Sequence, residues 1–267
     1  MNALLKKILR YLRIISQFMR VGIVRKSQFR VEFFSQVIMD LIWYFTHILV
    51  FEFLYLHTDS IAGWNREEIR VFLGFLFVSD AFMMACLGQN WHFADDLKNG
   101  NLDTFRVKPA STIFLYFFQR FSPEGFTNLL FALSYLFYAL FQKISFSPQT
   151  WVWLLWAILL SWWGRTIIVV FFSTIEFYIL NSELSRFFSE VYMSIEDRPL
   201  DIFPKRLRAF FIYILPVGLL SYIPACMLLG RIAWQTCLGF TLWLFFLGCL
   251  IFKFWNYSFR RYESALG

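Results

Sequence analysis

An all-α integral membrane protein is the fold class that this sequence predicts, and three observations point to it. Hydrophobic residues make up 59% of the 267 residues, which is more than a single soluble core of this length buries. These residues gather in runs close to the roughly 20 residues that cross a bilayer as a helix. Charged residues, 16% of the chain, collect between the runs. The short alternating segments typical of a membrane β-barrel are not found in the sequence.

Residues 1–30 are predicted to form an amphipathic helix that lies at the membrane surface. Basic side chains such as Lys6, Arg10 and Arg13 recur at spacings of three and four, and apolar residues such as Leu5 fall on the opposite side. This pattern is typical of helices that bind in the headgroup region. A signal peptide needs an uninterrupted apolar centre, which this segment lacks. We therefore expect the helix to remain in the mature protein.

Six spans are expected after this helix, at residues 33–56, 69–91, 125–141, 150–180, 209–222 and 238–255. The third apolar run is longer than one crossing needs, and its first third is interrupted at Arg120 and Pro123, so its span is placed further along. The fifth run contains Pro216 and Pro224, which interrupt a helix by removing backbone donors. A re-entrant segment near residues 223–236 is therefore expected between spans five and six.

The distribution of basic residues predicts the orientation of the chain. With the N-terminus in the cytoplasm, nineteen of the 25 Lys and Arg residues fall on the inner side, five of them in the polar block at residues 181–208. Only Arg66, Arg70, Lys143 and Arg231 fall on the outer side. The positive-inside rule then predicts that both termini are cytoplasmic.

The polar stretch at residues 94–109, between spans two and three, is predicted to be the main site of interaction with another protein. Leu97, Leu102 and Phe105 can form one apolar edge, Gly100 permits a tight bend, and Pro109 ends the segment. Its acids and bases suit a short helix on the membrane surface. The alternative is a solvated loop, and the fifteen or so residues alone leave both interpretations open.

Several classes of function are not favoured by the sequence. It contains no Gly-x-x-x-x-Gly-Lys-Ser/Thr motif, so the chain is not expected to hydrolyse ATP itself. His47, His57 and His92 lie in different segments, and no metal site or other cofactor is expected. The four cysteines lack paired spacing and are expected to pack as small apolar residues. The net charge of +7 alternates with the spans rather than forming one patch, so nucleic acid is not an expected partner.

A few ionisable residues fall inside the apolar runs, where they usually face another polar group or a watery path. The strongest candidate is Arg165, which lies deepest in its run; Asp80, His47 and Glu176 are the others. Two interpretations stay open for Arg165. It pairs with Asp80 or Glu176 and locks helices together, or it contacts an anionic substrate.

The order of these features resembles the permease subunits of ABC-2 type exporters, in particular the bacterial branch of uncharacterised ABC-2 permeases. The motifs that carry the resemblance are Gly-Asn-Leu-Asp-x-Phe-x-x-Lys-Pro at residues 100–109, Arg-Pro-x-x-x-Phe-Pro at residues 198–204, Tyr-Ile-Pro at residues 222–224 and Leu-Leu-Gly at residues 228–230. The resemblance extends over essentially the whole chain. The family usually has Arg where this sequence has Lys108, which preserves the charge.

The resemblance implies a multi-pass protein of the bacterial inner membrane that pairs with a second permease subunit, either a copy of itself or a different chain. A cytoplasmic ATPase dimer that binds ATP and Mg²⁺ would dock on the coupling helix, which maps here to about residues 94–106. The residues expected in this contact are Asp95, Asp96, Leu97, Gly100, Leu102, Asp103, Phe105 and Arg106. Membrane lipids are the other expected partners.

Two other functions are weighed against this one. A membrane scaffold would bind a partner through residues 181–208 and transport nothing. An intramembrane enzyme acting on lipids would need polar groups that converge at one depth, and only Asp40, Tyr44 and His47 are spaced to share a helix face.

Overall fold

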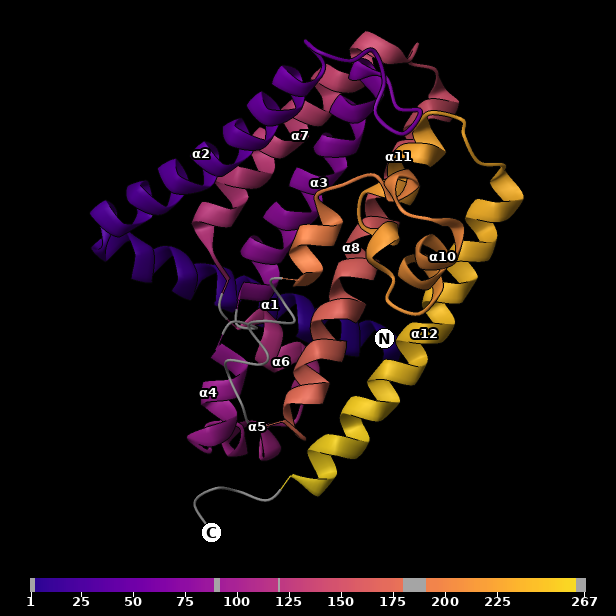
Figure 1. The fold of residues 1–267 in the computed structure, drawn as a ribbon. Coiled ribbons are helices and arrows are strands. Elements are labelled where there is room, and N and C mark those ends of the chain that lie inside the picture. Colours follow the sequence, from indigo (N-terminus) through magenta and orange to yellow (C-terminus); the bar gives the residue numbers. More distant parts are fainter. Residues whose placement is uncertain (1–2, 89–91, 120, 180–190, 263–267) are drawn as a thin grey trace.

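The computed structural model describes residues 3–88, 92–119, 121–179 and 191–262, and within this part it is built from helices without strands (Figure 1). Five described helices are long and apolar enough to cross a membrane. They are α2 (Arg30–Leu54), α3 (Arg66–Leu87), α7 (Pro123–Lys143), α8 (Pro148–Glu176) and α12 (Trp234–Arg261). The predicted all-helical fold is confirmed, and these five helices match five of the six predicted spans.

The helix α3 is the centre of the bundle, because side chains on all of its sides are buried. Its start is fixed by a capping box, in which Asn65 accepts from the Glu68 amide at 2.9 Å and the Glu68 carboxylate accepts from the Asn65 amide at 3.0 Å. Gly125 lets α7 approach α3 closely. A Cβ at Gly125 would lie 2.4 Å from the backbone nitrogen of Ala85, so only glycine fits there.

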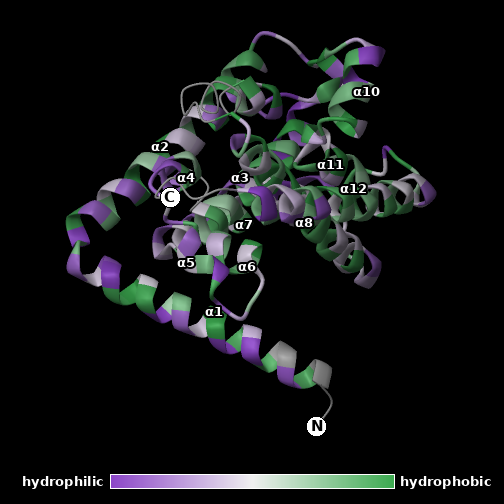
Figure 2. Cartoon of the chain, turned by 90° about the horizontal axis from the view of Figure 1, so that it is seen from below, coloured by the Kyte–Doolittle hydropathy of each residue, from purple (hydrophilic) through white to green (hydrophobic). Residues whose placement is uncertain are grey.

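The N-terminal helix α1 (Ala3–Gln28) forms a separate arm beside the bundle (Figure 2). It ends at Phe29, whose non-helical backbone (φ −116°, ψ 60°) turns the chain into α2. The Tyr11 hydroxyl accepts from the Ser111 amide at 3.2 Å, just before α6 (Thr112–Phe118), and the ring of Tyr11 meets Phe114 edge to face. Hydrophilic and hydrophobic residues alternate along this arm in Figure 2, as in an interfacial helix. Its location on a membrane surface stays a prediction.

The two ends of α3 define two ends of the bundle. The α2–α3 turn lies before its start, and α4 (Phe93–Lys98) and α5 (Asp103–Arg106) follow its end. A helix of this length rises by roughly 33 Å, so the two sites are far apart, as Figure 1 shows. We call them the turn end and the α4–α5 end.

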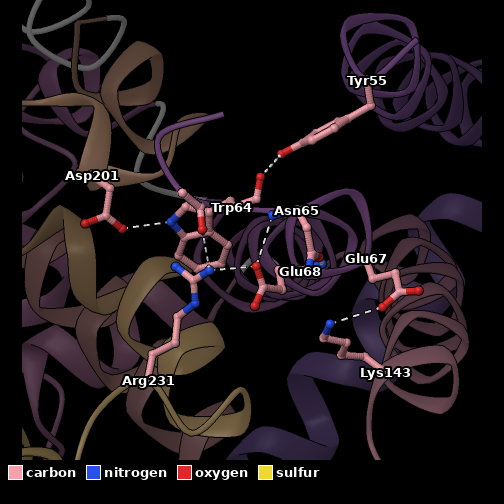
Figure 3. A network of polar contacts seen from close by, with 9 residues as sticks. Tyr55, Trp64, Asn65, Glu67, Glu68, Lys143, Asp201 and Arg231 are labelled. Carbon is pink, nitrogen blue, oxygen red and sulfur yellow. Dashed lines mark hydrogen bonds and ion pairs between the residues drawn. The ribbon is translucent and has the colours of Figure 1, made fainter. Parts of the chain in front are cut away.

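A polar network closes the turn end (Figure 3). The indole of Trp64 is fully buried and donates to Asp201 at 2.7 Å, and the Tyr55 hydroxyl donates to the Trp64 carbonyl at 2.7 Å. The Arg231 guanidinium lies 4.3 Å from the Trp64 ring centroid and donates to Glu68 at 2.6 Å. The network therefore joins segments that are more than 130 residues apart in sequence.

A single helical span at residues 209–222 is not found in the described part of the chain. This region consists of the short helices η2 (Leu200–Ile202), α10 (Lys205–Tyr213), η3 (Val217–Leu219) and α11 (Tyr222–Leu228). Pro216 starts the break after α10, and basic residues fill the first turn of α10, so no helix here is both long and apolar. Six spans are therefore not confirmed, and the re-entrant segment stays a prediction.

Part of the polar block at residues 181–208 contacts the turn end. Asp201 accepts from Trp64 and pairs with Arg208 at 2.7 Å. The count of basic residues had assigned this block and the α2–α3 turn to opposite sides of the membrane, which this contact does not support, and the side on which the block lies stays a prediction. The first ten residues of the block lie outside the described residues.

Candidate functional site

The segment from α4 to α5 forms a compact corner, and its apolar edge is directed inward. Gly100 has φ 69°, as the tight bend requires, and only a residue without a Cβ adopts this value easily. Leu97, Leu102 and Phe105 are at most 6% exposed. The sequence correctly grouped these three residues on one side, but they contact the chain's own core, where the Phe105 ring meets Tyr116 edge to face.

The acidic residues of this corner have different roles. Asp96 accepts from the Tyr116 hydroxyl and from the Asn101 amide, both at 2.8 Å, so it fixes the bend internally. Asp103 lies 3.7 Å from Arg106 in an i,i+3 ion pair. Asp95 has an exposed side chain. Of the three predicted contact acids, Asp95 is therefore the one that presents its carboxylate most openly.

Arg106 joins the corner to the end of α12. Its guanidinium donates to the Tyr262 carbonyl and lies 5.3 Å from the Tyr262 ring centroid and 5.6 Å from that of Phe259. The Tyr262 hydroxyl in turn donates to the Leu97 carbonyl at 3.2 Å. The corner is therefore in direct contact with the end of α12.

A cluster of aromatic rings lies under the same corner. Phe93, the first residue of α4, is fully buried, and its ring centroid lies 5.2 to 5.3 Å from those of Tyr116, Phe177 and Trp255. These rings connect α4 to α6, to the end of α8 and to α12. Phe93 was not predicted as a site residue, because one aromatic residue among 36 Phe gives no signal of its own.

The deepest ionic contact of the described residues joins α8 to the helical turn at residues 191–196. Arg165 pairs with Glu196, and each side chain is 3% exposed. Arg165 also donates to the Ser79 hydroxyl on α3 at 3.0 Å. Glu196 belongs to the polar block, so its burial inside the bundle was not predicted.

Of the two predicted partners of Arg165, Asp80 is close enough to interact with it electrostatically but forms no direct ion pair with it, and Glu176 is out of reach. Asp80 accepts from the Tyr44 hydroxyl at 3.3 Å, so it joins α2 to α3. Glu176 is buried at the other end of α8, and eleven residues of helix separate it from Arg165 by roughly 16 Å. The predicted helix-locking role of Arg165 is consistent with this geometry, but the partner is Glu196.

Three polar residues of α2 each contact a different partner. Asp40 accepts from the Asn128 amide on α7 at 2.6 Å, and Tyr44 binds Asp80. His47 lies 3.4 Å from Asp197, beside a groove of about 420 Å³ between α2 and residues 197–202. The convergence that an intramembrane enzyme needs is therefore not seen among these three side chains.

Comparison with protein families gives a result that agrees with this architecture. A family model described as ABC-2 family transporter protein matches residues 41–265. The chain belongs to the ABC-2 transporter family. Searches of curated proteins and of solved structures found no match.

The ABC-2 family is a family of membrane transport domains, and membership implies association with an ABC ATPase. In this ABC-2 permease the corner of α4 and α5 follows the second described span, as the resemblance predicted for the coupling helix. Within the described residues, no group of three His, Cys, Asp or Glu side chains is arranged to hold a metal ion.

Proposed function

We propose that this ABC-2 permease is one of two permease subunits of an exporter and that a separate cytoplasmic ATPase dimer drives it. The second subunit is either another copy of this chain or a different permease. In this proposal the α4–α5 end faces the cytoplasm of a bacterial cell and both termini lie on that side. The chain needs no cofactor of its own, and the partner binds ATP and Mg²⁺.

The observation that carries the proposal is the two-sided construction of the corner between α4 and α5. Its outer side exposes Asp95 and Thr104, and Val107 is 85% exposed. Its inner side is anchored by buried Leu97 and Leu102. The α4–α5 corner therefore combines an exposed surface for a bound protein with firm packing against the bundle, which suits it to pass a displacement from that protein to the helices.

The same anchoring supplies a physical route for coupling. When the ATPase dimer closes on ATP, the two copies of the corner are pushed together, and each corner moves as a unit because its bend is fixed internally. The aromatic contacts of Phe93 transmit the displacement to α8 and α12, and Arg106 transmits it to the end of α12. Rigid-body tilting of packed helices is a common response to such a push, and the outward-open arrangement is then selected by ATP binding.

The proposal is tested first by charge reversal at the corner. Asp95→Lys should reduce recovery of the ATPase with the affinity-purified permease, because the exposed carboxylate becomes a cation. Asp59→Lys makes the same change on an exposed side chain at the turn end and should leave recovery unchanged. Normal recovery and normal coupled ATP hydrolysis in Asp95→Lys would count against docking at this corner.

A second variant separates docking from coupling. Arg106→Ala removes the contact with α12 while leaving Asp95 in place, so the ATPase should still bind but substrate should stimulate its hydrolysis less. A membrane scaffold, the alternative function, would bind a partner and show no substrate-stimulated hydrolysis in any variant, including the wild type reconstituted in vesicles.

A further inference from the structure

A groove of about 440 Å³ lies in the corner between α1, α2 and the start of α7. Ile23, Phe33, Phe34 and Pro123 form its apolar walls, and Ser27 and Arg30 stand at its polar rim. The volume is within the range of ordinary ligand sites. Its surface is therefore divided into an apolar part and a cationic part.

Basic residues predominate along α1 and at the start of α2 beside this groove. The α1 sequence carries seven basic residues and no acidic residue, and Arg30 follows directly as the first residue of α2. Arg30 is exposed at the start of a candidate span. Basic residues at this position attract anionic lipid headgroups.

Lys26, at the same groove, forms ion pairs within the protein. Its ammonium lies 2.9 Å from both Glu124 on α7 and Glu32 on α2. Burial alone would lower the pKa of Lys26, but the hydrogen bonds to Glu124 and Glu32 and their negative charges outweigh it and raise the pKa. Lys26 therefore stays charged at neutral pH and holds the three helices together, while Arg30 is left to bind a ligand.

We propose that this groove binds one anionic phospholipid, with the lipid phosphate at Arg30 and the upper acyl chain against Phe33 and Phe34. A lipid matches the groove because both of its parts are used: a charged phosphate at the rim and hydrocarbon at the walls. Soluble phosphates would use the rim alone. The proposal depends on the membrane location of the chain and needs neither the ATPase nor transport, so the two proposals can fail separately.

The test is native mass spectrometry of the purified full-length chain, released from micelles that contain phosphatidylglycerol or phosphatidylcholine. The wild type should retain one phosphatidylglycerol in preference to phosphatidylcholine. Arg30→Gln should weaken this retention about fivefold, the effect of one basic residue near an anionic lipid. Arg13→Gln removes the same charge from an exposed position of α1 away from the groove and should change retention little.

Three outcomes would overturn the proposal. Equal losses in Arg30→Gln and Arg13→Gln would indicate diffuse attraction by the whole helix. Equal retention of the two lipids by the wild type would remove the role of charge. Displacement of the bound lipid by glycerol phosphate would show that the site takes a free phosphate. Because Arg30 is exposed, unchanged thermal unfolding of the variants is expected and serves as the folding control.

Discussion

Replacement of Arg165 by methionine tests the buried ion pair with Glu196. Each partner is 3% exposed, so the substitution leaves the Glu196 carboxylate buried without its cation. Removal of one partner from a buried pair costs about 3–5 kcal/mol of unfolding free energy. In a Glu196→Gln background the carboxylate that pairs directly with Arg165 is absent, so the same substitution should cost about 2–3 kcal/mol less, the size of coupling seen between contacting residues.

The measurement is a double-mutant cycle on reversible unfolding of the purified permease in mixed micelles. A second cycle with Glu176→Gln is the control, because Glu176 is on the same helix but out of reach of Arg165. The reasoning is refuted if Arg165→Met costs the same in the wild-type and Glu196→Gln backgrounds, or if Glu176 shows equal coupling. A variant that keeps full stability but loses transport would instead favour contact with an anionic substrate.

Two further predictions concern the packing and the orientation of the bundle. Gly125→Ala should lower the unfolding free energy by about 1–3 kcal/mol, as is typical of overpacking, because its Cβ would lie 2.4 Å from the backbone of Ala85. Gly239→Ala is the control and should not lower it, because a Cβ at Gly239 meets no neighbouring atom within 4 Å. Unfolding of the purified variants checks this, and equal effects would contradict the close approach. In a chain without its native cysteines, Asp59→Cys, in the α2–α3 turn, should react with an impermeant maleimide from the opposite side to Thr104→Cys. Labelling of both from one side would contradict the location of the turn end and the α4–α5 end on opposite sides of the membrane.

Five spans were predictable because hydropathy over about 20 residues reports directly on the energetics of crossing a bilayer. Local rules also worked: the bend at Gly100 depends on one residue whose backbone preference is visible in sequence. The short helices α10 and α11 were not predicted from the sequence, for a physical reason. An apolar composition favours burial in the bundle as well as exposure to lipid, so hydropathy does not distinguish short packed helices from one span.

The candidate site was less predictable than the fold. Sequence grouped Leu97 with Phe105 correctly, but it gave no sign that this edge contacts the chain's own core. Asp95 and Asp96 are neighbours with the same chemistry, and only the position of the Tyr116 hydroxyl separates their roles. The pairing of Arg165 with Glu196 joins residues 31 positions apart, and no periodicity reports a contact of that kind.

In the proposed exporter, the burial of Trp64 has a consequence for the route by which the substrate leaves the membrane. Because Asp201 and Arg231 contact the Trp64 indole from two separate segments, the turn end of a single chain is held together as one unit. A substrate pathway through this end of one chain would require the Trp64 indole to lose its contacts with both Asp201 and Arg231. Separation of two permease subunits along the interface between them would leave all of these contacts intact. An exit pathway at the subunit interface therefore costs less free energy than one through a single chain.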